Sequence, residues 1–298
     1  MKSSLTFQNQ PVVELTQGSS RALFAPQSGA RLLLWEVNGT QVILWPAQAD
    51  WSKSAKIRGG NPILFPFVAR HYVDGVIDKW RDASGTIRNM PAHGFCREAR
   101  FEEISEDANS IRMRLHESET TLSYYPFQFQ FDVIYRLTAN SLEAEFAVSN
   151  TGEKALPYFA GHHFYFAIPH LERANWRLET PFARTGRQKP DGSIIEQPNT
   201  DASTALDRQE IVDRYLISPT APSLSLKNSL TNRTIQFDLT VPGSVPWYAV
   251  TTWTENAESD FYCVEPWLGL PNAIHHQLGL RWVQPGQSER AICRLVLT

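Results

Sequence analysis

Hydrophobic and polar side chains alternate with a period of two over much of this chain. Within residues 127–138 an apolar residue occupies every second position, and after a turn at Ala139 and Asn140 the alternation resumes over residues 142–148. Successive side chains of a β-strand point to opposite faces, so this pattern places the apolar residues on one face. It predicts a long antiparallel hairpin with one buried side.

A second hairpin is predicted at Asn38-Gly39, between strands at residues 32–37 and 40–45, because these two residues tolerate the positive φ values of a type I′ turn. Further strands are expected at residues 111–116, 235–239, 247–253, 261–264 and 291–297, and one short helix within residues 204–216. No repeat or linker-like stretch divides the chain. The pattern predicts an all-β fold, a single large antiparallel β-sandwich over residues 1–298.

The charge and hydropathy of the chain argue against a nucleic-acid partner and against a membrane span. The chain has 28 Lys and Arg against 31 Asp and Glu, a net charge of −3, without a long run of either sign. A nucleic-acid partner normally requires a basic face and is therefore not expected. A membrane span is not expected either, because no stretch of about 18 consecutive apolar residues is present.

The N-terminus and the cysteines indicate a reducing compartment. The N-terminal segment lacks the apolar core of a secretory signal. Cys96, Cys263 and Cys293 are odd in number, far apart and without a Cys-x-x-Cys pair. This number and spacing of cysteines is typical of reduced thiols and does not match a metal-binding motif. A cytoplasmic protein is therefore expected.

Arginine and glycine residues frame an apolar segment in the first quarter of the chain. Arg58 precedes Gly59 and Gly60, and the Pro-bounded apolar run that follows ends at Arg70. Glycines without a Cβ allow the backbone to come close to a ligand, which the arginines would then contact. The alternative is a glycine-rich turn with solvated arginines.

A histidine beside a glycine forms a second motif. His93 precedes Gly94, and Arg97 follows shortly after. A ring with few steric neighbours suits contact with a ligand. A lone histidine is more often a hydrogen-bonded structural residue, so this motif does not decide between the two roles.

Two adjacent histidines lie in an aromatic segment. His162 and His163 are followed by Phe164, Tyr165 and Phe166. In a strand, neighbouring side chains face opposite ways, so only one of the two can point into a given site. One is expected to act as an acid or base and the other to be structural. Metal binding would require further His or Cys residues at suitable spacing, which are not evident.

A carboxylate closes an apolar strand near the C-terminus. Glu265 follows the apolar run and directly precedes Pro266, which cannot continue a central ladder, and Trp267. Partial desolvation there would raise the pKa of Glu265 towards that of a general base. A solvent-facing glutamate at a strand end is the alternative.

Together and in this order, the four motifs resemble the aldose 1-epimerase family, also called galactose-mutarotase-like proteins. The matching elements are RGGxPxLFPFxxR from Arg58, HGFxR from His93, GxHxYF from Gly161 and EPWxGxPNA from Glu265. The resemblance implies a β-supersandwich of many antiparallel strands, which agrees with the alternation. It also implies an isomerase of small-molecule sugars that needs neither cofactor nor metal.

The resemblance implies a role for each of the two central residues. In such enzymes a carboxylate takes the proton of the sugar's C1 hydroxyl while a histidine protonates the ring oxygen. The ring opens, the C1–C2 bond rotates, and closure gives the other anomer. Glu265 matches the base, and His163, directly before Phe-Tyr-Phe, matches the acid.

Substrate contacts are implied in the same way. Arg70 matches an arginine that binds sugar hydroxyls, and His93 a histidine that holds the substrate near the ring oxygen. Asp213 is the expected substrate-binding acid, in preference to Asp207. Trp267 is expected to stack on or border the sugar.

The resemblance leaves two classes of substrate, namely free aldoses and sugar phosphates. The Arg58-Gly59-Gly60 opening and Arg97 resemble hexose-6-phosphate epimerases, in which arginines bind the phosphate, and Lys56, Arg58 and Arg97 would form such a cluster. However, Ala92 stands where that branch commonly has Gln. Many family members have Asn where this chain has Ala69, so one sugar contact is missing. A free aldose is therefore expected in preference to a phosphosugar.

Two other function classes remain. A non-catalytic sugar-binding protein would not need both His163 and Glu265. A glycoside-cleaving enzyme would need a second carboxylate, for which Asp260 is close in the chain. His275 and His276 are interpreted as loop residues. The sequence gives no prediction of oligomeric state.

Overall fold

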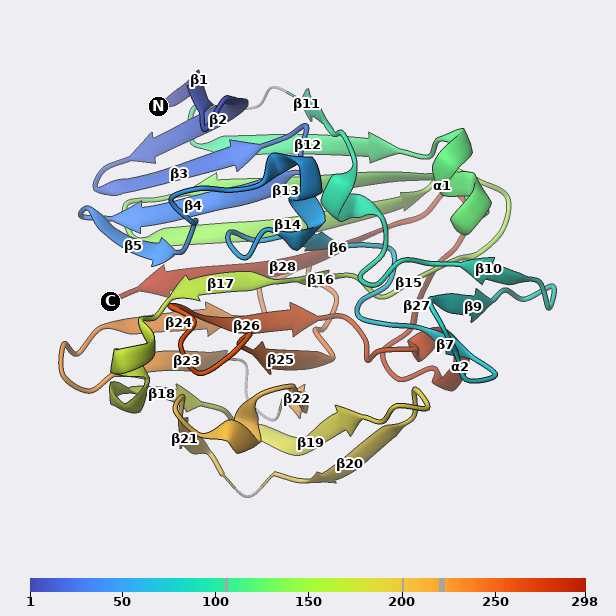
Figure 1. Ribbon diagram of the computed structural model, residues 1–298. Helices are drawn as coiled ribbons and strands as arrows, with labels where there is room; N and C mark the ends of the chain where they lie inside the picture. Colours follow the sequence, from blue (N-terminus) through green and yellow to red (C-terminus); the bar gives the residue numbers. More distant parts are fainter. Residues whose placement is uncertain (105–106, 200, 220–222) are drawn as a thin grey trace.

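Two large antiparallel sheets dominate the computed structural model, which describes residues 1–104, 107–199, 201–219 and 223–298 (Figure 1). Within that part, 13 strands form the first sheet along the order β1-β2-β3-β4-β5-β17-β26-β25-β22-β19-β20, with β16 and β6 attached beside β26. Nine strands form the second sheet in the order β11-β12-β13-β14-β28-β24-β23-β18-β21. The predicted all-β antiparallel fold is confirmed.

The strands of the first sheet are β1 (Lys2–Phe7), β2 (Gln10–Gln17), β3 (Ser20–Ala25), β4 (Arg31–Val37), β5 (Thr40–Ile43), β6 (Ile63–Leu64), β16 (Gly161–His162), β17 (Phe164–Ala167), β19 (Phe182–Gln188), β20 (Ile194–Pro198), β22 (Arg214–Pro219), β25 (Ala249–Trp253) and β26 (Phe261–Trp267). Those of the second are β11 (Glu102–Ile104), β12 (Ser110–His116), β13 (Phe129–Leu137), β14 (Ser141–Asn150), β18 (Trp176–Glu179), β21 (Ser203–Ala205), β23 (Ser223–Asn228), β24 (Thr234–Asp238) and β28 (Ser288–Leu297).

Short ribbons and helical turns connect the sheets. The ribbons are β7 (Tyr72–Val73) with β8 (Val76–Ile77), β9 (Lys79–Arg81) with β10 (Ile87–Asn89), and β15 (Leu156–Tyr158) with β27 (Arg281–Val283). The helical elements are α1 (Glu119–Tyr124), α2 (Ala273–His276) and the 3-10 turns η1 (Trp51–Lys56), η2 (Cys96–Glu98), η3 (His170–Asn175) and η4 (Gln209–Ile211). No helix in the described chain is long and apolar enough to cross a membrane.

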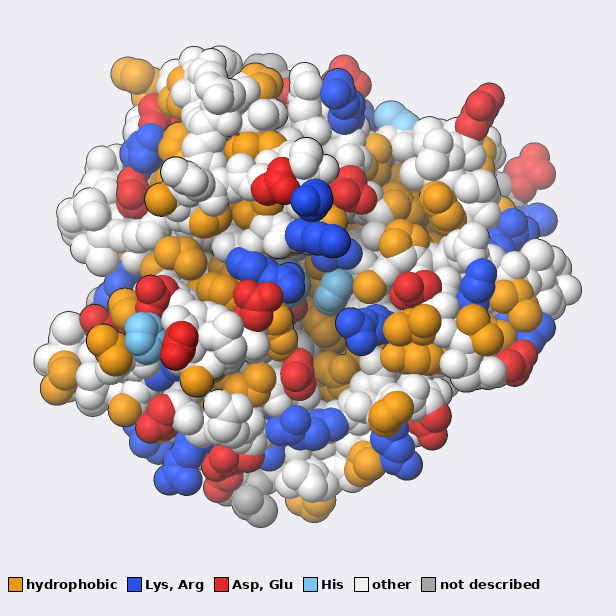
Figure 2. All heavy atoms as spheres, in the orientation of Figure 1, with side chains coloured by type: hydrophobic (Ala, Val, Ile, Leu, Met, Phe, Trp, Pro, Cys, Tyr) orange, Lys and Arg blue, Asp and Glu red, His pale blue; other side chains and the backbone are white. Residues whose placement is uncertain are grey.

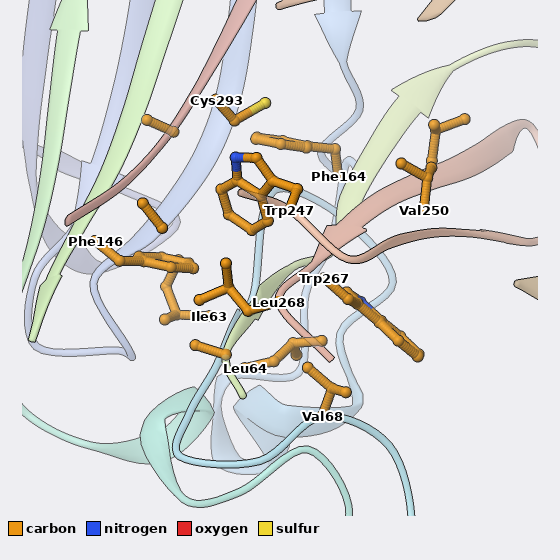
Figure 3. Packing of buried hydrophobic residues seen from close by; sticks show 14 of the residues in the cluster. Ile63, Leu64, Val68, Phe146, Phe164, Trp247, Val250, Trp267, Leu268 and Cys293 are labelled. Atoms are coloured by element: carbon orange, nitrogen blue, oxygen red, sulfur yellow. The ribbon is translucent and has the colours of Figure 1, made fainter. Parts of the chain in front are cut away.

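The hydrophobic core lies between the two sheets. Phe24 of β3 contacts Tyr135 of β13 with 4.9 Å between ring centroids. In Figure 3, Cys293 of β28 lies beside Phe164 of β17, the residue that follows His163, and Trp247 lies between Phe164 and Phe146 of β14. Each buried ring or large aliphatic side chain stabilises the fold by roughly 1.5–3 kcal/mol. This packing holds the first sheet in place. The candidate functional site lies on the face of that sheet that points away from the core.

Both predicted hairpins are present. Residues 127–138 and 142–148 correspond to β13 and β14, which pair in register from Phe129 opposite Asn150 to Leu137 opposite Leu142. At the other hairpin Asn38 has φ 51° and Gly39 has φ 72°, both in the left-handed region that the type I′ turn requires.

The predicted helix within residues 204–216 is wrong. That segment contains only the single turn η4, flanked by β21 and β22. The backbone of β22 pairs with β25, and the hydrogen bonds and burial gained in the sheet outweigh a weak local preference for helix.

Candidate active site

The site lies on β26, at a point where its neighbouring strand is interrupted. His163 falls between β16 and β17, both of which pair with β26. Opposite this gap, Glu265 and Pro266 have ladder partners only on β25. The strand does not end at Glu265 as predicted but continues to Trp267, because a proline without an N–H is tolerated where the ladder is open.

Cross-strand register collects the side chains on one face of the first sheet. Thr251 of β25 pairs with Glu265, and Tyr215 of β22 pairs with Thr251. His163 lies on the other side of Glu265, with 3.4 Å between His163 Nδ1 and Glu265 Oε1. Directly opposite side chains in a sheet share a face. His163, Glu265, Thr251 and Tyr215, which are far apart in sequence, therefore form one polar row.

This row is the floor of a pocket of about 660 Å³. Figure 2 shows the hollow near the middle of that face, with blue Lys and Arg side chains around it and a histidine inside. Eight residues singled out from the sequence line it, namely Arg58, Arg70, His93, Arg97, His163, Asp213, Glu265 and Trp267. Lys56, which was grouped with Arg58 and Arg97 as a candidate phosphate cluster, is not among the lining residues.

Several lining residues were not found by sequence reasoning. Tyr165, Arg187, Gln188, Tyr215 and Thr251 also border the pocket. Tyr165 lies within the GxHxYF element, two positions from His163, so strand alternation was a signal that could have identified it. The others needed the register between strands, which the sequence does not specify.

The two adjacent histidines point to opposite faces, as alternation requires. His162 is fully buried in the core between Phe146 and Phe164, with ring centroids 4.1 and 4.9 Å away. His163 lines the pocket and stacks on Tyr165 at 4.8 Å with only 6° between the ring planes. The structure therefore gives His162 a packing role and His163 access to a ligand.

Asn61 holds this pair of histidines in place. Its side-chain Oδ1 accepts the backbone N–H of His163 at 2.8 Å, and its Nδ2 donates to Nδ1 of His162 at 2.9 Å and to the Tyr135 hydroxyl at 2.8 Å. Asn61 is completely buried. It replaces the ladder hydrogen bond that is lost at the strand break, so it fixes the backbone that carries His163.

His163 and Glu265 form a buried pair on the pocket floor. Their exposed fractions are 8% and 1%, and in the described chain His163 Nδ1 and Glu265 Oε2 have no hydrogen-bond partner. Burial raises the pKa of Glu265 well above its ordinary value, with a smaller lowering contribution from Trp267. Burial, and then the positive charges of nearby arginines, lower the pKa of His163.

Burial thus favours the neutral form of both groups. Adding a second proton would charge His163 beside Arg97, and removing the first would leave an ionised Glu265 away from water. The arrangement with a protonated His163 and an ionised Glu265 has the same total charge and differs by one transfer over 3.4 Å.

His93 presents a hydrogen-bond donor to the pocket. Its ring Nδ1 accepts a hydrogen bond from the backbone N–H of Ala69 at 3.1 Å. The backbone N–H of His93 donates in turn to the carbonyl of Ala69 at 2.8 Å. Because Nδ1 accepts a hydrogen bond, the ring proton is on Nε2, and burial lowers the pKa of His93. Ala69 has φ 58°, a conformation that Asn adopts more readily than Ala.

Three arginines make one side of the pocket electropositive. Arg58, Arg97 and the buried Arg31 all act on the pKa of His163. Arg58 is paired with Glu255 at 3.0 Å. Arg97 donates to backbone carbonyls, and no carboxylate in the described residues lies within ion-pair distance of it.

The acidic side of the pocket is at Asp213. Burial raises its pKa, while Arg187 and Arg70 lower it. Asp207, the alternative considered from sequence, is not among the lining residues. β22 and β17 are separated by β26 and β25 in the sheet, so roughly 14 Å separates Asp213 from the strand of Tyr165.

Gly59 and Gly60 of the first motif do not line the pocket, which corrects the prediction that they bring the backbone close to a ligand. A Cβ on Gly60 would lie 2.1 Å from the Leu32 carbonyl oxygen, and one on Gly59 would lie 2.7 Å from Pro46. These glycines permit close packing of the chain against β4 and the residues after β5. Arg58 nevertheless reaches the pocket.

Two other interpretations from sequence can be compared with the structure. Asp260 does not line the pocket and instead binds His170 at 2.8 Å. Spacing predicted no metal ligands, yet ligand atoms of His163, Cys263 and Glu265 all lie within 4.8 Å of one another. The spacing of residues in the sequence did not indicate this group of three, because His163 is far in the chain from Cys263 and Glu265 of β26.

The chain belongs to the aldose 1-epimerase family, whose pattern it matches over residues 11–291. Protein LacX (chromosomal) of Lactococcus lactis subsp. lactis is 27% identical over 253 residues, covering 78% of this chain and 79% of that protein.

Solved structures share the fold. Slr1438 from Synechocystis sp. PCC 6803 has a TM-score of 0.85 at 24% identity, covering 99% of this chain and 98% of that one. A galactose mutarotase-like protein from Lactobacillus casei ATCC 334 has a TM-score of 0.79 at 19% identity, covering 96% and 100%. The predicted galactose-mutarotase-like β-sandwich is confirmed.

Proposed function

We propose that this protein is a mutarotase that interconverts the α and β anomers of an aldose. The observation that carries the proposal is the buried pair of His163 and Glu265, 3.4 Å apart on the floor of a polar pocket. Anomer exchange removes a proton from the C1 hydroxyl and adds one to the ring oxygen. A pair that carries one proton provides one acceptor and one donor.

In the proposed reaction Glu265 is the base and His163 the acid. A C1 hydroxyl that donates a hydrogen bond to Glu265 favours its carboxylate form, and His163 then carries the proton that the pair shares. Glu265 takes the hydroxyl proton as His163 protonates the ring oxygen and the C1–ring oxygen bond breaks. After rotation about C1–C2, both transfers reverse and the ring closes. No electrons are transferred, so the chemistry requires no redox cofactor.

Sugar binding is assigned to the other lining residues. His93 Nε2 would donate to a sugar oxygen, and Arg70 and Asp213 would bind hydroxyl groups. The hydroxyl of Thr251 is buried and lacks a partner within the described chain. Buried polar groups are normally hydrogen-bonded, so a hydroxyl-rich ligand that satisfies them would bind favourably.

Freshly dissolved α-glucose and α-galactose should reach rotational equilibrium faster with the protein than without it. Polarimetry, or NMR exchange between anomeric protons, measures the rate, with heat-denatured protein as the control. The proposal fails if no free or phosphorylated aldose is accelerated.

A hexose phosphate is the second candidate substrate, and the arginines favour it. Arg97 has hydrogen bonds only to carbonyl groups in the described structure and no ion pair with a carboxylate, so its charge is available to an anionic substituent. Arg58 lies above the ring of Trp253 at 5.1 Å, at the same pocket. Arginine binds phosphate through two parallel hydrogen bonds.

Arg97→Ala is expected to lower kcat/KM for glucose 6-phosphate by roughly tenfold or more while changing that for glucose less than about threefold, because hydrogen bonds to charged groups contribute about 1.5–3 kcal/mol. Arg58→Ala should act in the same direction. Arg177→Ala, outside the pocket on β18, is the matched control. Equal losses on both sugars would mean that the arginines do not bind a phosphate.

A further inference from the structure

A thiol lies directly behind the proposed acid–base pair. Cys263 precedes Glu265 by two positions on β26, so both side chains emerge on the same face, and it is paired in register with Tyr165. Cys263 is fully buried and packs in a small cluster with Tyr165 and Phe261. The pocket reaction described above gives this thiol no role.

The ligand atoms of these side chains match the requirements of a small metal site. The His163 nitrogen, the Cys263 sulfur and a Glu265 oxygen lie within 4.8 Å of one another, and Nδ1 of His163 is 3.4 Å from Oε1 of Glu265. Bond lengths of about 2.0–2.3 Å to Zn²⁺ require tetrahedral ligand atoms roughly 3.3–3.7 Å apart. The His–Glu distance already satisfies this, and the sulfur lies within 4.8 Å of both other ligand atoms.

Two further features favour a cation. Nδ1 of His163 and Oε2 of Glu265 are buried and unpartnered in the described chain, so a metal ion would satisfy groups that the protein leaves open. His163 and Glu265 also line the pocket, which provides an entry path and room for a fourth ligand. The double charge of the ion would be matched by one thiolate and one carboxylate, despite the nearby arginines.

We propose that the pocket floor binds a thiophilic divalent cation such as Zn²⁺ through His163, Cys263 and Glu265, and that this ion inhibits the enzyme. Three protein ligands and one open position are a common arrangement for zinc at a reactive site. The inhibitory part rests on the proposed mutarotase function, because the ion would engage both proton-transfer groups and exclude the sugar. The binding part does not depend on that function.

Co²⁺ titration of the chelator-treated full chain tests binding directly. Tetrahedral Co²⁺ with a thiolate ligand is expected to give an intense near-ultraviolet sulfur-to-metal band that saturates at one ion per chain, and added Zn²⁺ should remove it. Cys263→Ala should abolish the band, with Cys263→Ser as a second variant that preserves size. Cys293→Ala, which removes a buried thiol of β28 in the other sheet, should leave it unchanged.

Inhibition is tested on the same proteins. The Zn²⁺ concentration for half-inhibition should rise at least about tenfold in Cys263→Ala, since loss of even an outer-shell partner of a metal ligand costs 10–100-fold in affinity, and should not rise in Cys293→Ala. The absence of a charge-transfer band in excess Co²⁺, or equal Zn²⁺ sensitivity of Cys263→Ala and wild type, overturns the proposal. A band in a protein that turns over no sugar would refute only the mutarotase function.

Discussion

Glu265→Gln is expected to reduce the rate of anomer interconversion by roughly 10²–10⁴-fold, the range that a positioned general base contributes. The amide has nearly the same shape as the carboxyl but cannot accept a proton from the C1 hydroxyl. Sugar affinity should change little, because the amide can still hydrogen-bond to that hydroxyl. The loss should therefore be seen in kcat, measured by NMR exchange at saturating sugar.

Glu258→Gln, an exposed glutamate outside the pocket, is the control and should retain full activity. The role of Glu265 as base is contradicted if Glu265→Gln keeps more than about a tenth of the wild-type kcat, since a base contributes at least about 10²-fold.

The same substitution should change how stability depends on pH. Because burial raises the pKa of Glu265 above its ordinary value of 4.5, the folded protein binds this proton more tightly than the unfolded chain. The resulting stabilisation is complete below pH 4.5 and is lost as the pH rises towards the folded-state pKa. Glutamine has no such proton. The free energy of unfolding of Glu265→Gln relative to wild type should therefore increase over that range in urea titrations.

His163→Asn is expected to lower kcat by a similar factor, roughly 10²–10⁴-fold, because asparagine cannot protonate the ring oxygen. The backbone N–H at this position would still bind Asn61, so the fold should persist. The lowered pKa of His163 means that the folded wild type loses stability as the pH falls below the ordinary value of 6.5. His163→Asn should lack this loss, which thermal unfolding at several pH values measures.

The adjacent histidine provides the matched control. His162→Asn should lower the free energy of unfolding by about 1–3 kcal/mol, because it removes a ring packed between aromatic side chains. The protein that remains folded should still interconvert anomers. If His162→Asn abolished turnover in folded protein and His163→Asn did not, the assignment of the acid would be wrong.

Much of the fold could be predicted because alternation is a local property. The hairpin of β13 and β14 follows from apolar residues at every second position, and the turn at Asn38-Gly39 follows from the φ values that only a few residues tolerate. The helix predicted within residues 204–216 is absent because the end of this segment belongs to β22, which pairs with β25, a strand remote in the chain.

The sequence alone determined which residue types were available for chemistry and, through alternation, that His162 and His163 could not share one site. Only the tertiary structure decided that the strand through Glu265 continues past Pro266, that Asn61 carries the backbone of His163, and that Thr251 and Tyr215 complete the row. It also brought Cys263 behind the pair. The reason is physical: period two fixes which face a side chain takes, but the register and order of strands arise from packing between distant segments.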